Sequence, residues 1–222
     1  MFRQERFPYA VAYGAALGDE WVVDSHQPGR GGVPGRYKGG ADLVDVRIDL
    51  DGDGALETAE RAPVSDLRLR HRSRDAVIWT RTLVVPPQHE NRVLGALAGA
   101  YLESTAPAGP LAADFQPRDP TAPVRWTARV LDTLPMSVDG REAHGVLVDA
   151  SFLGPFGASR PTRVALVFVR TSHVWEDADL GYRRTWPVVL VAGYMTDAES
   201  FEGGWDHFAR FLGQVRIMPA EE

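Results

Sequence analysis

Cysteine is absent from the 222-residue sequence, and its absence excludes several kinds of site. Without thiols the chain has no disulfide, no cysteine-bound zinc or iron–sulfur centre and no cysteine nucleophile. Lysine is nearly absent as well, because Lys38 is the single lysine and the GRYKGG segment around it places no serine or threonine after it. A P-loop for nucleotide phosphates and a Schiff-base enzyme are therefore not expected.

Long apolar runs are also missing. No stretch approaches the roughly 20 apolar residues that a membrane-spanning helix needs. The start, MFRQERFPYAVAYG, has charges where a signal peptide has its apolar region. The net charge of -6 provides no general basic surface for nucleic acid. We therefore expect no membrane span, no signal peptide in this numbering and no nucleic-acid partner.

The residues that are present suffice for one sizeable core. Hydrophobic residues make up 44% of the chain and include six tryptophans and nine phenylalanines. A chain of this length hides roughly 70% of its unfolded surface when it folds. We expect a single domain over residues 1–222, with the Pro-rich connection at residues 106–123 as the only candidate boundary.

Two-residue alternation of apolar and polar side chains predicts most of the strands. The predicted strands are 41–48, 67–71, 76–85, 124–131 and 141–152, the last two joined by an Asp139-Gly140 turn that is a strong hairpin signal. The runs VALVFV (164–169) and VVLVA (188–192) are apolar on both faces, which indicates central strands.

Helical spacing of apolar residues appears in two places. The segment 89–104 is the first predicted helix, and 198–212 is the second, with Phe201, Trp205, Phe208 and Leu212 on one stripe. A short strand at 215–217 follows. This order of elements predicts an α+β fold, an antiparallel sheet with two main helices packed against it.

The end of the chain adds a family resemblance. The segment WPVVLVAGYMTDAESFEGGWDHFARFLGQVRI resembles the C-terminal strand, helix and closing strand of the PsbP-like family, including its bacterial lipoprotein-type members. The earlier part of the chain resembles this family in the order of its elements alone. Because the family consists mostly of binding and assembly proteins without an active site, the resemblance implies a non-catalytic role.

The most specific motif is DLDGDGALETAE, which matches the 12-residue EF-hand-type calcium loop. Gly54 stands at the sharp bend and apolar Leu56 at the eighth position. Calcium requires six to eight oxygen ligands. The predicted Ca2+ ligands are Asp49, Asp51, Asp53, the Ala55 carbonyl, Glu57 and Glu60.

The sequence around this loop differs from that of an EF-hand. A strand precedes the loop and Pro63 follows soon after it, where a sensor EF-hand has two amphipathic helices. The ion would therefore be a structural pin between two strands and not a signalling switch. A weak calcium loop would stay largely empty at cytosolic calcium levels, which favours an extracytoplasmic location, in the periplasm or at the cell surface. An acidic turn without metal is the alternative.

Other residue patterns predict no second site of comparable specificity. Arg68, Arg70, Arg72 and Arg74 alternate along one strand, as a basic stripe or a solvated strand face would. The histidines have no HExxH or other short paired spacing, so they carry no zinc signature, and His71 is expected to be a half-buried packing residue.

The segment WEDADLGY places Glu176, Asp177 and Asp179 beside aromatic residues, as a carbohydrate-cleaving site or a solvated acidic loop would. The function we expect is a non-catalytic, calcium-stabilised binding or assembly module with a protein partner. A carboxylate-dependent hydrolase and a cytoplasmic interaction protein without metal are the alternatives. The sequence leaves the oligomeric state open.

Overall fold

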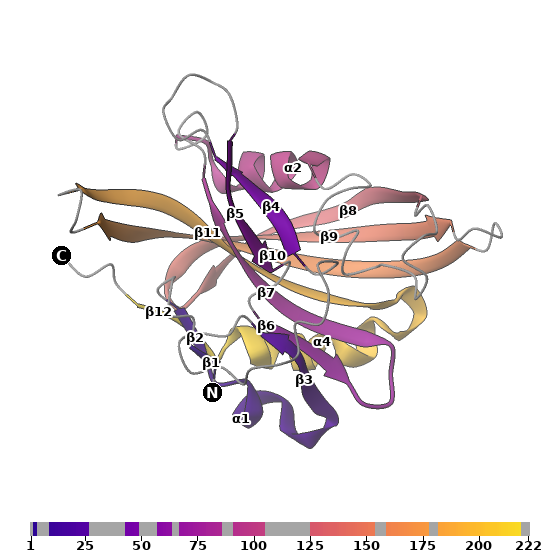
Figure 1. Cartoon of the computed structure of the whole chain (residues 1–222). Helices are drawn as coiled ribbons and strands as arrows, with labels where there is room; N and C mark the ends of the chain where they lie inside the picture. The colour runs from indigo at the N-terminus through magenta and orange to yellow at the C-terminus, as the bar shows by residue number, and fades with distance from the viewer. Residues whose placement is uncertain are drawn as a thin grey trace.

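The structure is a computed structural model that describes residues 2–3, 9–26, 43–48, 57–63, 67–85, 91–104, 125–153, 159–177 and 182–218. Its centre is a seven-stranded antiparallel sheet in the order β3-β6-β7-β11-β10-β9-β8 (Figure 1). The strands of this main sheet are β3 (Trp21–His26), β6 (Leu67–His71), β7 (Ala76–Val84), β8 (Arg125–Val138), β9 (Arg141–Leu153), β10 (Ser159–Asp177) and β11 (Tyr182–Asp197).

Two smaller antiparallel sheets accompany it. One contains β1 (Phe2–Arg3), β2 (Tyr9–Val11) and β12 (Val215–Ile217), and the other is the hairpin of β4 (Leu43–Ile48) and β5 (Glu57–Pro63). The predicted strand at 215–217 is confirmed, but its partner is β2 and not a strand of the main sheet.

The α-helices are short. They are α1 (Tyr13–Leu17), α2 (Leu94–Ser104) and α4 (Glu202–Leu212), and two 3-10 turns, η1 (Gly18–Glu20) and η4 (Ala198–Ser200), precede β3 and α4. Helix α2 begins later than predicted, because the Val93 carbonyl accepts the first N–H bonds of the helix and Asn91 lies in the turn before it. None of the helices in the described ranges is long and apolar enough to cross a membrane.

The predicted hairpin between β8 and β9 is confirmed. Asp139 and Gly140 both have positive φ angles, 51° and 71°, as the two central residues of a type I′ turn require. The turn is also tied to the small sheet, since the backbone N–H of Ile217 donates a hydrogen bond of 2.7 Å to the Asp139 carboxylate.

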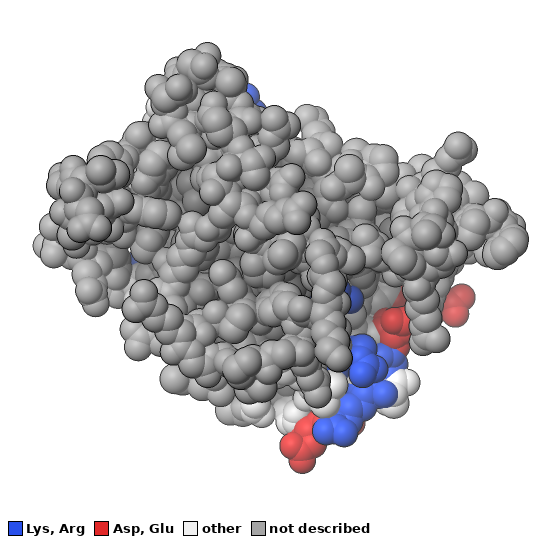
Figure 2. Space-filling model, viewed as in Figure 1, with Lys and Arg blue, Asp and Glu red and all other residues white. Residues whose placement is uncertain are grey.

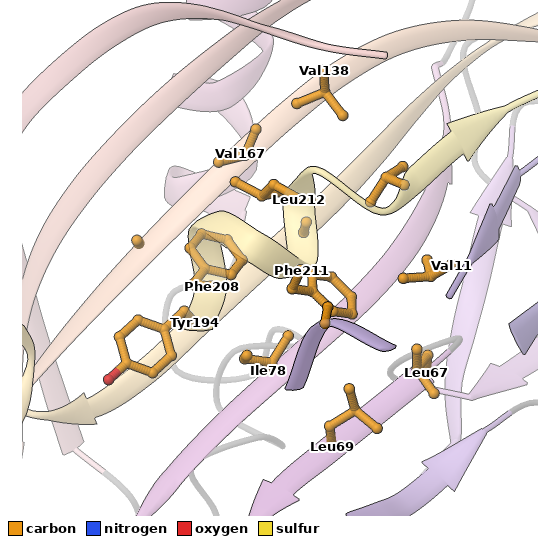
Figure 3. Close-up of a cluster of buried hydrophobic side chains, with 14 of the residues drawn as sticks. Val11, Leu67, Leu69, Ile78, Val138, Val167, Tyr194, Phe208, Phe211 and Leu212 are labelled. Atoms are coloured by element: carbon orange, nitrogen blue, oxygen red, sulfur yellow. The ribbon is translucent and has the colours of Figure 1, made fainter. Parts of the chain in front are cut away.

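The two apolar runs form the middle of the main sheet, as predicted. Strands β10 and β11 lie side by side in the strand order, and residues 164–169 and 188–192 are all buried. Alternate side chains of these strands belong to two separate cores. One core, on the face covered by α4 and α1, contains Val167, Tyr194 and Phe208 (Figure 3). The core on the opposite face contains Leu166, Val191 and residues of α2.

Helix α4 packs through the stripe that periodicity predicts, with one addition. Phe201, Phe208 and Leu212 are buried, whereas Trp205 is only partly buried. Phe211 lies off the stripe and is nevertheless fully buried, in the same core as Ala16 and Leu17 of α1, the helix that packs against α4.

The predicted fold class is wrong. Strands make up most of the described chain, in antiparallel sheets, and the two longest helices have 11 residues each, so two main helices packed against a sheet do not describe the fold. The physical reason is the length of the strands: β8 continues through Pro135 to Val138, and β10 runs for 19 residues. Strands this long extend past the area of the sheet that a short helix can cover. Their backbone groups are still paired there, because neighbouring strands of the hairpins hydrogen-bond to each other. The Pro-rich connection at 106–123 lies outside the described residues.

Candidate functional site

The predicted calcium loop falls at the tip of the β4–β5 hairpin. Asp49, Asp51, Asp53 and Ala55 lie outside the described residues. Glu57 and Glu60 lie in β5, and the ladder pairs them with Ile48 and Val46 of β4. The last four residues of the 12-residue motif thus belong to β5, and the motif joins two strands as predicted. Calcium binding itself stays a prediction.

Within the described ranges, one group of titratable side chains has the composition of a metal site. It consists of Glu20 in η1, His71 at the end of β6 and His207 in α4, whose ligand-type atoms lie within 4.8 Å of one another. The indole of Trp21, the first residue of β3, completes what we call the imidazole cluster. Its rings pack edge-on, with centroids 5.2 Å apart for Trp21 and His71 and 6.0 Å apart for Trp21 and His207.

His71 is held by the turn that follows it. The chain reverses after β6 over residues 72–75, and the His71 Nδ1 atom accepts the backbone N–H groups of Ser73 and Arg74, each at 3.2 Å. The side chain is buried, as the sequence suggested in part, and its Nε2 atom has no hydrogen-bond partner. The nearest carboxylate oxygen, from Glu20, lies 3.6 Å away, beyond direct hydrogen-bond distance.

His207 is held by the edge strand of the main sheet. The Trp21 Nε1–H group donates a hydrogen bond of 3.1 Å to the Nδ1 atom of His207. Burial is the largest of the causes that lower the pKa of His207 below its ordinary value, and the positive charge of Arg210 lowers it further. Glu20 opposes these effects, while His71 and Arg74 reinforce them.

The hydrogen bonds decide whether the imidazole cluster fits a metal ion. One carboxylate and two imidazoles form the ligand set of some zinc sites. Histidine ligands, however, bind a metal through one ring nitrogen and donate the N–H of the other to a neighbour. In His71 and His207 that other nitrogen, Nδ1, accepts from an N–H group, so a neutral ring carries its proton on Nε2. The residues fit a hydrogen-bonded contact between elements and do not fit a metal site.

Sequence spacing could not reveal this cluster. Glu20, His71 and His207 come from three elements that the tertiary structure brings together, and no short motif connects them. The one local signal is the polar turn after His71, since Ser73 and Arg74 supply the N–H groups that its ring accepts.

Only two of the four arginines in the predicted stripe lie in a strand. Arg68 and Arg70 lie in β6, but Arg72 and Arg74 lie in the turn beyond it. Arg72 donates to the Asp19 carbonyl at 2.7 Å, and Arg74 donates to the Gly203 carbonyl at 3.3 Å. Figure 2 shows acidic and basic side chains next to each other at this end of the molecule. They form a mixed surface and not a continuous basic face.

The described residues of the segment predicted as an acidic loop, 175–177 and 182, lie in strands. Glu176 and Asp177 lie in β10, paired with Arg183 and Tyr182 of β11, because the hairpin of these strands continues almost to its tip. Asp179 lies outside the described residues.

Among known proteins, the chain is weakly similar to solved structures. No family model and no curated protein matches the sequence. The chain is similar to the solution structure of cyanobacterial PsbP (CyanoP) from Synechocystis sp. PCC 6803, with a TM-score of 0.42 and 12% identity over 97% of this chain and 90% of that one. It is also similar to the crystal structure of PA94, a Pseudomonas aeruginosa protein of unknown function, with a TM-score of 0.37 and 10% identity over 90% of this chain and 99% of that one. Similarities this weak assign no family, activity or ligand to this chain.

Proposed function

We propose that this chain is a non-catalytic binding or assembly module whose β4–β5 hairpin is stabilised by one calcium ion. The observation that carries the proposal is the isolation of this hairpin. Among the described strands, β4 and β5 hydrogen-bond only to each other, and the DLDGDGALETAE segment joins them. A two-stranded hairpin alone is marginally stable in water. A cation bound to the carboxylates of its tip would supply the missing stabilisation.

The register of the hairpin suits this role. The ladder ends at the pair Ile48 and Glu57, so Glu57 lies at the end of the ladder that the acidic segment joins. Glu60 pairs with Val46 farther along, and β5 has one residue more than β4 between these two pairs. A bulge of this kind bends the bulged strand. The contribution of Glu60 to calcium binding therefore needs a separate variant.

The imidazole cluster supports the non-catalytic part of the proposal. A general base needs a free lone pair within reach of a substrate proton. The Nδ1 lone pairs of His71 and His207 are both used by N–H donors inside the protein. The cluster then acts as a contact between α4 and the edge of the main sheet.

The partner surface that we propose is strand β8. It is the last strand of the main sheet among the described residues, and Val130 and Leu134 on it are 48% and 57% exposed. Edge strands with exposed apolar side chains are sites at which another protein can add a strand. Once a partner has been isolated, Leu134→Lys should weaken its binding and change the stability of the free chain by no more than about 0.5 kcal/mol. Undiminished binding would exclude this surface.

The proposed location is extracytoplasmic. A weak calcium loop fills only where calcium is near millimolar, as it is outside the cytoplasm. Fractionation of the native host should find the protein in the periplasm or at the cell surface. Recovery from the cytosol alone would contradict this location and favour an interaction protein without metal.

Calorimetric titration of the metal-stripped chain tests the calcium site. We expect saturable binding of one Ca2+ per chain, with a dissociation constant no weaker than the millimolar end of the loop family. Asp49→Asn should remove most of the binding, and Glu60→Gln should weaken it if Glu60 is a ligand. An absence of binding up to millimolar calcium would exclude the site.

Hydrogen exchange shows where the ion acts. Calcium should slow exchange of the backbone amides in β4 and β5, because binding shifts the hairpin toward its paired state. The amides of β9 and β10 provide the internal control and should change little, since they belong to the buried main sheet. Protection of β9 and β10 without protection of the hairpin would place the ion elsewhere.

A further inference from the structure

The imidazole cluster of Glu20, Trp21, His71 and His207 connects three parts of the fold. Glu20 and Trp21 lie where η1 meets β3, His71 ends β6, and His207 lies in the last helix. The rings of His71 and His207 are stacked, with an interplanar angle of 12° and centroids 6.4 Å apart. The contact between Trp21 and His207 therefore links the edge of the main sheet to α4 through one side-chain hydrogen bond.

The direction of that hydrogen bond follows from the chemistry of indole. An indole nitrogen carries a hydrogen and has no lone pair to offer, so Trp21 can only donate. The Nδ1 atom of His207 must then be the acceptor, and the proton of the neutral ring is on Nε2. The same reasoning holds for His71, whose Nδ1 atom faces two backbone N–H groups.

We propose that the imidazole cluster is a proton-operated contact, closed while His207 is neutral and opened when His207 takes a second proton. The second proton can go only to Nδ1, because Nε2 already carries one. The new Nδ1–H group would point at the Trp21 Nε1–H group, and two donors cannot share a hydrogen bond. Trp21 must then turn away from His207 or exchange its partner for water.

The charged groups around His207 set the pH at which this happens. Glu20 from η1 favours the protonated ring, whereas Arg74 from the turn after β6, Arg210 from α4 itself and a protonated His71 disfavour it. Burial is the largest influence and also disfavours the charged ring. The contact should therefore be closed at neutral pH and open below the ordinary histidine pKa of about 6.5.

Opening would be local. The neighbouring residues Phe208 and Phe211 are fully buried in the core beneath α4, and they hold the helix whether or not His207 is protonated. The surface released by opening is that of the Trp21 indole, which is buried while the contact is closed. This inference is independent of the calcium proposal, because it uses no residue of the β4–β5 hairpin.

Nuclear magnetic resonance of the 15N-labelled full chain tests the contact. The side-chain nitrogens of His207 and the indole N–H of Trp21 are followed over the range in which histidine titrates, about pH 8 to 5. The indole signal is assigned by its loss in Trp21→Phe, since the chain has six tryptophans. We expect an unprotonated Nδ1 in His207 at neutral pH, and one midpoint for the His207 titration and the shift of the Trp21 indole.

Two variants separate this contact from its surroundings. In His207→Asn the side-chain oxygen can replace Nδ1 as acceptor but does not titrate, so the Trp21 shift with pH should disappear. In His71→Asn the oxygen can accept the N–H groups of Ser73 and Arg74, and the Trp21 shift should remain. An indole signal that does not follow His207 in the wild-type chain would overturn the proposal, and so would an unchanged shift in folded His207→Asn.

Discussion

Gly193 and Trp79 face each other on the neighbouring strands β11 and β7 and show how a single residue position is determined by packing. The Trp79 ring is buried and occupies the space that a side chain at Gly193 would need, because a Cβ atom built there overlaps three ring atoms. The glycine is required by this close approach and not by its backbone angles.

Gly193→Ala is therefore expected to destabilise the fold. The ring cannot move freely inside a packed core, so the cost should reach about 1 to 3 kcal/mol, the usual range for overpacking. Chemical denaturation measures this difference. Gly99→Ala is the control, since a Cβ atom there meets nothing within 4 Å, and alanine inside a helix should stabilise α2 by about 0.5 to 1 kcal/mol. Equal effects of the two substitutions would contradict the packing at Gly193.

His207 should contribute a pH-dependent part of the stability. Its pKa in the folded chain is lowered, chiefly by burial, so the neutral ring stabilises the fold above the unfolded pKa of about 6.5. That contribution is lost as the pH falls through the lower folded value. The unfolding free energy of the wild-type chain should therefore fall more between about pH 7 and pH 5 than that of His207→Asn, which does not titrate in this range. Equal losses in both proteins would mean that His207 does not titrate as described.

At the scale of elements, helix α4 shows how two packing partners share one helix. Phe208 and Leu212 of its stripe and Phe211 beside them belong to one core on this face of the main sheet (Figure 3), and α1 packs against α4. Trp205 lies at the edge of this core and contacts Phe201 and Phe208 through ring pairs with centroids 5.8 Å apart.

Truncation of α4 side chains should reflect these positions. Phe208→Ala removes a fully buried ring and should cost about 3 to 5 kcal/mol. Trp205→Ala should cost less, although it removes a larger side chain, because Trp205 is only partly buried. The midpoints of thermal unfolding of the two variants provide the comparison. A larger loss for Trp205→Ala would mean that α4 presents a different face to the sheet.

At the scale of the whole molecule, calcium should raise the free energy of unfolding of the whole chain only if the β4–β5 hairpin unfolds together with the rest of the chain. If the native state alone binds the ion, calcium at 100 times its dissociation constant should add about 2.7 kcal/mol. The melting temperature should then rise with calcium and fall with chelator. The double substitution of Asp49→Asn and Glu60→Gln should remove this dependence and relieve carboxylate repulsion in the empty loop.

A melting temperature that does not change with calcium would have two explanations, and hydrogen exchange distinguishes between them. Protection of β4 and β5 without a change in melting would mean that the hairpin opens separately from the main sheet. Absence of both effects would contradict the proposed structural role of calcium.

Local sequence patterns predicted those parts of the fold that depend on neighbouring residues. The Asp139-Gly140 turn follows from the rarity of residues that accept two positive φ angles, and the buried central runs follow from their lack of polar residues on either pleat face. The stripe on α4 likewise follows from helical periodicity. The calcium-type loop is also identified by a short run of neighbouring residues. Calcium binding there stays a prediction, which the described residues do not test.

Other features depended on elements far apart in the chain. The pairing of β12 with β2, the packing of α1 against α4 and the dominance of long strands over helices are each decided by where distant segments pack. The imidazole cluster is the clearest case, because the hydrogen bonds of Trp21 and His71 determine what His207 beside them can do. Periodicity determines which face of an element is apolar, and only the tertiary structure decides which distant groups share that face and which ring nitrogen remains available to accept a proton.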